Sequence, residues 1–145
     1  MNNIEIFDMS FDDFKEIEPI FSDFDDFWST QNLKSELENI NSKYIVAKLC
    51  NQIVGFAGIW FSVDDAHITN IAVHKNMRLK GIGSKLLEEL ISHAKQHKKS
   101  SLTLEVNTKN ESAKKLYLKY GFENLGVRKK YYNGTEDAYI MTLYF

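Results

Sequence analysis

The sequence predicts an α/β fold in which helices flank a mixed sheet, with the element order β-α-α-β-β-β-α-β-α-β-β. Two observations predict this fold. Along the 145 residues, the spacing of apolar side chains changes between the helical and the strand period. A glycine-rich stretch, RLKGIGS, also follows an expected strand and opens a helix. Because the chain shows no repeat and no Pro/Gly-rich linker, we expect a single domain over residues 1–145.

The first half of the chain is expected to supply a strand, two helices and three further strands. A short strand at EIF precedes a helix that begins at the N-cap Ser10 and that Pro19 should kink or end. A second short helix is expected over residues 29–40. The β-rich runs KYIVAKL and IVGFAGIWF, separated by CNQ, then indicate a hairpin, and residues 66–73 indicate a third strand.

The second half is expected to alternate helices and strands. The helix after the glycine-rich stretch has an apolar stripe formed by Leu86, Leu87, Leu90, Ile91 and Ala94. SLTLEV follows as a strand, and NESAKKLYLKYGF follows as a helix with Gly121 as its C-cap. Two last strands, around residues 122–130 and 137–144, are joined through the turn signal YNGT.

The composition excludes several classes of protein. The longest apolar run has nine residues, whereas a membrane-spanning helix needs about 20. The acidic N-terminus lacks the basic and then apolar layout of a secretion signal. One cysteine, Cys50, allows neither an internal disulfide nor a thiolate zinc site. We therefore expect a cytoplasmic protein with no membrane partner.

Charge is distributed unevenly along the chain. Residues 1–30 contain nine acidic residues and one basic residue, whereas residues 74–131 contain fourteen Lys or Arg and five Glu. One part of the molecule should therefore attract cations and another should attract anions. Two ordinary solvated faces would give the same pattern, and composition alone leaves both interpretations open.

The glycine-rich stretch has the features of an anion site. A helix N-terminus presents unpaired N–H groups, and glycines let the backbone approach a bulky phosphate. Arg78 and Lys80 add positive charge. The nucleotide-triphosphate motif G-x-x-x-x-G-K-[ST] is absent, and Leu86 stands where a dinucleotide motif would have its third glycine. A helix start without a ligand remains possible on the stretch alone.

Two longer motifs resemble a known family. NIAVHKNMRLKGIGSKLL resembles the core motif of the GCN5-related N-acetyltransferases (the GNAT superfamily), with a strand ending in Ala-Val, the pattern R-x-x-G-x-G, and an amphipathic helix. LEVNTKNESAKKLYLKYGF is similar to the next strand and helix of that family. The resemblance extends from about residue 65 to the C-terminus, and is greatest to the bacterial ribosomal-protein-alanine N-acetyltransferases (the RimI type).

This resemblance implies the GNAT fold and a co-substrate, acetyl-CoA, with no metal. In the family, the amides of the glycine-rich turn bind the pyrophosphate, and the strand before it pairs with the pantetheine arm. The amide of Val73 would polarise the thioester carbonyl. The positions that match the family's cofactor-binding residues are Ile71, Ala72, Val73, Arg78, Leu79, Lys80, Gly81, Ile82, Gly83, Ser84 and Asn110.

The resemblance also assigns two catalytic residues. Strand alternation places Glu105 on the face opposite Leu104, which by itself predicts a solvated glutamate. The family position makes Glu105 the general base, acting directly or through water. Tyr117, by spacing alone a core residue, becomes the acid that protonates the leaving thiolate. We expect direct attack in a ternary complex, because Cys50 has no histidine near it in sequence and is not expected to act as a nucleophile.

The resemblance also implies that the acceptor lies between the first two helices and the last hairpin, where the family binds it. The positions that match the family's acceptor-binding aromatic residues are Phe27, Trp28, Tyr131 and Tyr132. A peptide α-amine, with a pKa of about 7.7–8.0, loses its proton more easily than lysine at about 10.4, which favours a protein N-terminus. The resemblance to the RimI type implies that this N-terminus belongs to a ribosomal protein. The alternatives are a small amine such as a polyamine, or a non-catalytic acyl-CoA-binding module. We expect no direct nucleic-acid partner, and a monomer or weak homodimer.

Overall fold

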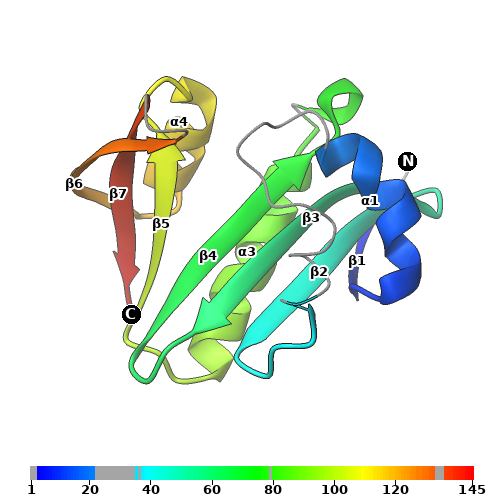
Figure 1. Ribbon diagram of the computed structural model, residues 1–145, viewed down its shortest axis with the longest axis horizontal. Helices are drawn as coiled ribbons and strands as arrows, with labels where there is room; N and C mark the ends of the chain where they lie inside the picture. Colours follow the sequence, from blue (N-terminus) through cyan, green and yellow to red (C-terminus); the bar gives the residue numbers. More distant parts are fainter. Residues whose placement is uncertain (1–2, 22–34, 36, 79, 133–135) are drawn as a thin grey trace.

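The computed structural model describes residues 3–21, 35, 37–78, 80–132 and 136–145. Within these residues, seven strands form one mixed sheet in the order β1-β2-β3-β4-β5-β7-β6 (Figure 1). The strands are β1 (Ile4–Asp8), β2 (Ser42–Leu49), β3 (Gln52–Phe61), β4 (Asp65–Val73), β5 (Ser101–Asn107), β6 (Glu123–Tyr132) and β7 (Glu136–Tyr144). The helices are α1 (Phe14–Phe21), α3 (Ile82–Gln96) and α4 (Glu111–Lys119). The predicted mixed α/β fold is confirmed.

Of the two effects predicted for Pro19, a kink or an end of the helix, the end does not occur, because α1 runs to Phe21. A 3-10 turn at Phe11–Asp13 precedes it, and the backbone N–H of Ser10 donates to the Asp13 carboxylate at 2.8 Å. The helix expected over residues 29–40 lies largely outside the described residues, and residues 38–41 form a turn into β2, so it does not extend to its predicted end.

The pairing of β4 with its two neighbours is unequal. β3 and β4 pair as antiparallel strands along nearly their whole length, from Gly55–Val73 to Phe61–Ala66. β4 and β5 run parallel and pair only where residues 65–67 oppose residues 101–103. Beyond that ladder the two strands diverge (Figure 1). The remainder of β4, residues 68–73, is therefore an open edge within the described part of the sheet.

A β-bulge lies in β4 just after the point of divergence. Gly58 opposes Asn70, but the next residue, Ile59, opposes Ile68, so Thr69 is the extra residue. The Tyr44 hydroxyl lies 3.0 Å from Thr69 Oγ1 and donates to Asn70 Oδ1 at 3.4 Å. A Cβ at Gly58 would lie 2.2 Å from the Tyr44 ring. Glycine at this position therefore lets the ring lie across β3 and reach the bulge.

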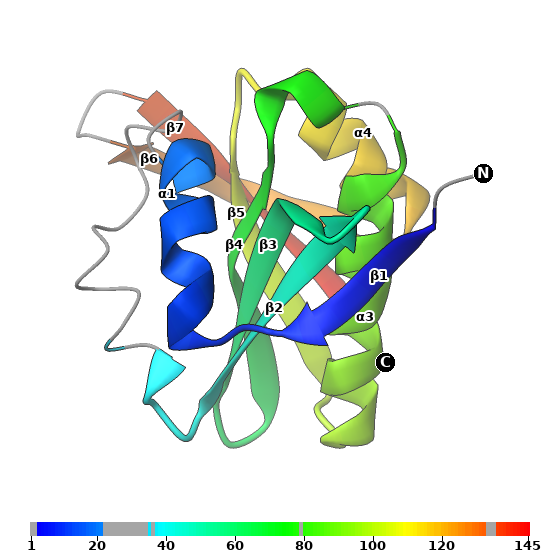
Figure 2. The same cartoon turned by 90° about the vertical axis from the view of Figure 1, so that its right-hand side faces the viewer.

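Helices cover both faces of the β2–β4 part of the sheet, with α1 on one face and α3 on the other (Figure 2). The stripe predicted on α3 lies in the main core, where Leu86, Leu87, Leu90 and Ala94 are fully buried and Ile91 is partly buried. Phe14 and Ile17 of α1 pack with Tyr44 and Phe56 in a second core on the opposite face.

Candidate active site

The open edge of β4 presents main-chain groups that the sheet does not use. The N–H of His74, next after β4, donates to the Val54 carbonyl of β3 at 2.8 Å. Because successive main-chain groups of a strand point to opposite edges, the N–H groups of Ile71 and Val73 face away from β3. They face the edge from which β5 has already diverged. These are two of the residues that the motif assigned to cofactor binding.

The first turn of α3 supplies a second set of amides. Gly81 is the N-cap, with φ +84°, and no side chain caps the helix. The N–H of Lys85, which donates to the Gly81 carbonyl at 3.1 Å, makes the first bond of the helix. Helix geometry leaves the amides of residues 82–84 without an intrahelical partner. Together with the helix dipole, these amides are an arrangement that can bind an anion.

The glycines of this turn leave space around it. A Cβ at Gly81 would meet nothing within 4 Å. A Cβ at Gly83 would lie 3.7 Å from Leu116 Cδ2 of α4 and 3.8 Å from Val73 Cγ2 of β4, which are ordinary contacts. The turn therefore lies between the end of β4 and α4. Packing of the protein does not require glycine at position 83, whereas close approach of a bulky ligand would.

The predicted cofactor-binding residues divide into two kinds. The side chains of Ala72 and Ile82 are buried in the core, so only their main chain can face a ligand. Arg78 and Lys80 are exposed and add positive charge beside the turn. An open strand edge, unpaired helix amides and cations are the chemistry that a pantetheine arm and its pyrophosphate need. The residues present therefore fit acetyl-CoA. Leu79 lies outside the described residues.

Two side chains assigned to the cofactor have bonds within the protein. Asn110 is the N-cap of α4, where its Oδ1 accepts from the backbone N–H of Ala113 at 3.2 Å. Ser84 hydrogen-bonds to the Tyr120 hydroxyl, which also donates to the Glu88 carboxylate. The Glu88 bond is the main reason that the pKa of Tyr120 is raised. Asparagine is a preferred N-cap residue, so the capping role of Asn110 could have been predicted from its place at the start of the expected helix.

Tyr117 lies in the last turn of α4, and the turn that follows fixes its place. Gly121 has φ +95°, the Phe122 N–H donates to the Tyr117 carbonyl at 3.1 Å, and the Gly121 N–H donates to Leu118 at 3.0 Å. These are the bonds of a Schellman motif. The rings of Tyr117 and Phe122 meet edge to face, with centroids 5.7 Å apart. The LYxxxGF spacing thus has a physical cause, because it builds this helix end around the tyrosine.

The environment of Tyr117 keeps its hydroxyl protonated. The residue is 8% exposed and packs in the main core. Burial raises the pKa of Tyr117 from 10.0 to about 12, because the core disfavours the phenolate. Among the described residues, its hydroxyl has no hydrogen-bond partner. An unpaired O–H in a core position is available for a ligand.

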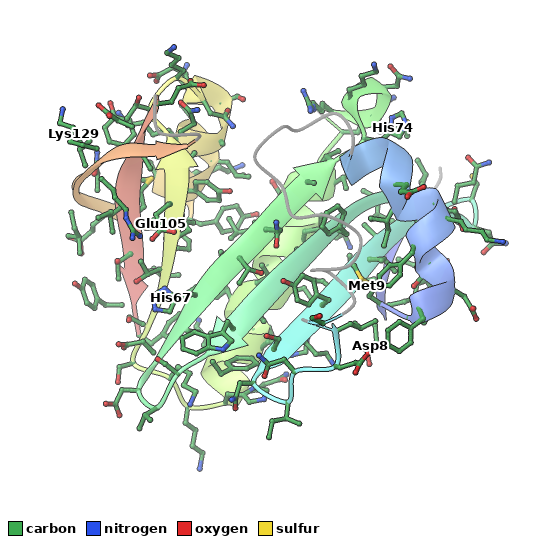
Figure 3. The ribbon with its side chains drawn as sticks, in the orientation of Figure 1. Asp8, Met9, His67, His74, Glu105 and Lys129 are labelled. Atoms are coloured by element: carbon green, nitrogen blue, oxygen red, sulfur yellow. The ribbon has the colours of Figure 1, made fainter. Side chains whose placement is uncertain are left out.

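Glu105 lies on the other face of β5. Leu104 and Val106 point into the main core with Tyr117. Glu105 and Thr103 point away from it, and Thr103 bonds to Thr142 of β7 at 2.9 Å. The Glu105 side chain is 22% exposed and lies along β5 (Figure 3). Glu105 and Tyr117 therefore flank β5 from opposite faces of the sheet.

Arg128 is a residue of this site that sequence reasoning missed. Its Nη1 lies 3.5 Å from Glu105 Oε1. The basic run RKK before the tyrosine pair was the only signal for it. That signal does not show which of the three cations faces Glu105, because the answer depends on the order of strands in the sheet.

The residues expected to bind the acceptor are not brought together by the described structure. Phe27 and Trp28 lie outside the described residues. Tyr131 and Tyr132 end β6, where Tyr132 opposes Glu136, and their side chains are not described. The acceptor site therefore stays a prediction from the resemblance.

Neither a metal-binding cluster nor a membrane-spanning helix occurs among the residues that the structure describes. No group of three or more His, Cys, Asp or Glu side chains could hold a metal ion there. Among the same residues, no helix has the length and apolarity needed to cross a bilayer.

Comparison with known proteins supplies independent information. The Acetyltransferase (GNAT) family profile matches residues 4–122. A putative ribosomal protein bS18-alanine N-acetyltransferase of Bacillus subtilis is 38% identical over 123 residues, covering 83% of this chain and 81% of the relative. The ribosomal protein bS18-alanine N-acetyltransferase of Escherichia coli is 34% identical over 121 residues, covering 80% of each. A crystal structure of the ribosomal-protein-S18-alanine N-acetyltransferase from Escherichia coli superimposes with a TM-score of 0.88 at 29% identity, covering 98% of this chain and 94% of that one.

Proposed function

From the premise that this chain belongs to the GNAT acetyltransferase family, we propose that it acetylates the N-terminal α-amine of a ribosomal protein, with the alanine of bS18 as the first candidate. Family membership confirms the resemblance drawn from the motifs, and the chain is an N-acetyltransferase. The observation that best supports the proposal is the open edge of β4 beside the first turn of α3. The comparisons do not favour the small-amine or non-catalytic alternatives.

Acetyl-CoA would be held mainly by the main chain. Its pyrophosphate would accept from the amides of the first turn of α3, with Arg78 and Lys80 beside it. Its pantetheine arm would pair with the open edge of β4, as a peptide does when it adds to the edge of a sheet. The outward N–H of Val73 would then donate to the thioester oxygen and stabilise the charge that develops there.

The two catalytic residues would act from opposite faces of the sheet. The amine nitrogen attacks the thioester carbon, an N–C bond forms, and the C–S bond breaks. Glu105 receives the proton lost by the amine, directly or through water, and Tyr117 gives its proton to the thiolate. Because Glu105 and Tyr117 lie on opposite faces of β5, the amine and the thiolate would each meet their partner on a separate side of the diverging strands.

The experiment is a transfer assay with labelled acetyl-CoA. The acceptors are a peptide that copies the N-terminus of bS18, the same peptide with a blocked α-amine, a lysine-containing peptide without a free N-terminus, and spermidine. We expect label only on the free bS18 peptide. Faster labelling of spermidine or of the lysine side chain would contradict the proposed acceptor.

The same assay tests the two catalytic roles. Glu105→Gln removes the base, and Tyr117→Phe removes the acid, so each should lower kcat by roughly 10²–10⁴-fold. Neither residue is proposed to hold acetyl-CoA, so calorimetry should give nearly unchanged affinities for both variants. Wild-type turnover in both variants would refute the roles assigned.

A further inference from the structure

Arg128 reaches Glu105 across an intervening strand. In the sheet, β7 lies between β5 and β6. Arg128 of β6 opposes Ala138 of β7, and Ala138 opposes Asn107 of β5. Directly opposed residues lie on the same face, so Arg128 and Asn107 share a face, and Glu105, two residues before Asn107, shares it too. A fully buried alanine at position 138 leaves room for the long arginine side chain to cross β7.

The Arg128–Glu105 pair differs from two other ion pairs that involve β6 or β7. Lys129 Nζ lies 3.4 Å from Asp137, and Lys109 Nζ lies 3.5 Å from Glu136. Both of these acids lie at the start of β7, and Lys129 points away from Glu105 at the end of the hairpin (Figure 3). The Arg128 pair, in contrast, reaches a proposed catalytic group, Glu105.

Stability does not account for this pair. The Arg128 side chain is 57% exposed and that of Glu105 is 22% exposed. Pairs as exposed as this contribute little to the free energy of unfolding, because water and salt screen them. A guanidinium is planar and permanently charged, so it can hold a carboxylate in one orientation. Orientation is what a general base needs, because proton transfer requires hydrogen-bond geometry.

We propose that Arg128 is a positioning residue for Glu105, and that its guanidinium holds the carboxylate in the orientation in which it receives the proton of the acceptor amine. This inference rests on the proposed function. It also links the base to β6, the strand that ends in Tyr131 and Tyr132, where the resemblance places the acceptor. The hairpin that is expected to bind the peptide would thus also align the group that deprotonates it.

The test compares Arg128→Gln, Arg128→Lys and the matched control Lys129→Gln, a cation on the same strand that pairs with Asp137. Misorientation of the base should lower kcat by roughly tenfold to a hundredfold in Arg128→Gln and leave the KM for acetyl-CoA unchanged. Arg128→Lys should recover part of the loss, because it keeps the charge but loses the planar fork. Lys129→Gln should keep the wild-type kcat.

A double variant decides whether Arg128 acts through Glu105. In the Glu105→Gln background there is no carboxylate to orient, so adding Arg128→Gln should lower kcat no further. An additional loss as large as that in the wild-type background would overturn the proposal, as would a wild-type kcat in Arg128→Gln.

Failure of the proposed function would look different. Wild-type turnover in Glu105→Gln itself would refute the base, whereas a large loss in Glu105→Gln together with an unaffected Arg128→Gln would refute only the positioning role.

Discussion

Among single residues, Tyr117 shows most clearly how one position serves both fold and site. Its carbonyl accepts the closing bond of the helix end, and its ring packs on Phe122, while its hydroxyl has no partner among the described residues. Spacing alone predicted the core position, and only the family motif predicted the catalytic one. The structure is consistent with both predictions, because the ring packs in the core while the hydroxyl group takes no part in that packing.

The raised pKa of Tyr117 predicts a loss of stability in alkali. Its folded pKa, about 12, lies above the ordinary 10.0. The protonated Tyr117 therefore contributes fully to the free energy of unfolding below pH 10. This contribution is lost as the pH rises toward 12, because the unfolded chain releases the tyrosine proton at a lower pH than the folded protein does. Two units correspond to about 3 kcal/mol. Urea unfolding of wild type and Tyr117→Phe at several values between pH 8 and 11.5 should show the steeper fall in wild type.

Tyr144→Phe removes a tyrosine that is 59% exposed and serves as the control. Parallel slopes for wild type and Tyr117→Phe would contradict the buried, protonated hydroxyl.

At the residue scale, the limit of sequence reasoning is Arg128. Glu105 was placed on the face opposite Leu104 by alternation, and the structure agrees. Its contact with Arg128 could not be predicted, because 23 positions separate the two residues and a third strand lies between them. Periodicity describes what one strand presents to each face, but not which strand becomes its second neighbour.

Among the elements, α3 most clearly separates the residues that stabilise the fold from the residues that would bind a ligand. Its buried stripe was predicted from periodicity, and its glycine-rich start from the need for unpaired amides. The helix packs on β2, β3 and β4 through that stripe, so its first turn is held at the end of β4 whether or not a ligand is present. The glycines can therefore be tested separately for stability and for binding.

Gly83→Ala should separate the two functions of this turn. The new Cβ makes only ordinary contacts with Leu116 and Val73, so the free energy of unfolding should stay the same or rise by up to about 1 kcal/mol. Affinity for acetyl-CoA should fall, because the backbone can no longer approach the ligand as closely. Gly83→Glu should abolish binding by bulk and repulsion. Thermal melts and calorimetry measure the two effects.

Unchanged affinity in Gly83→Glu would contradict the assignment of the turn to the pyrophosphate. A large loss of stability in Gly83→Ala would show that packing, and not the ligand, requires the glycine.

At Gly58, unlike at Gly83, a substitution by alanine should lower the stability of the fold. A Cβ there would meet the Tyr44 ring at 2.2 Å and Thr69 Oγ1 at 2.6 Å, so Gly58→Ala must displace the ring from the bulge. Overpacking of this kind costs about 1–3 kcal/mol. Gly126→Ala on β6 is the matched control, because its Cβ would meet nothing within 4 Å. Urea unfolding should show the loss in Gly58→Ala only, and equal stabilities would contradict the packing described.

At the scale of the whole molecule, the sequence predicted the types and order of most elements but not their arrangement. Local periodicity identifies strands, whereas the order β5-β7-β6 and the divergence of β4 from β5 depend on pairings between distant segments. The same limit applies to the acceptor site, whose expected residues come from the acidic first 30 residues and from the last hairpin. The open edge of β4 was anticipated only through the family motif.

The short ladder between β4 and β5 has a consequence for the occupied protein. Within the described sheet, three opposed residue pairs join β1–β4 to β5–β7, and the Ser101 hydroxyl donates to the Asp65 carboxylate at the same end. A pantetheine arm lying along β4 would occupy the gap between β4 and β5 and add contacts between the two strands. Its release after turnover would remove those contacts. Each catalytic cycle would then alternately stiffen and loosen the joint between the half of the molecule that holds the cofactor and the half that carries Glu105.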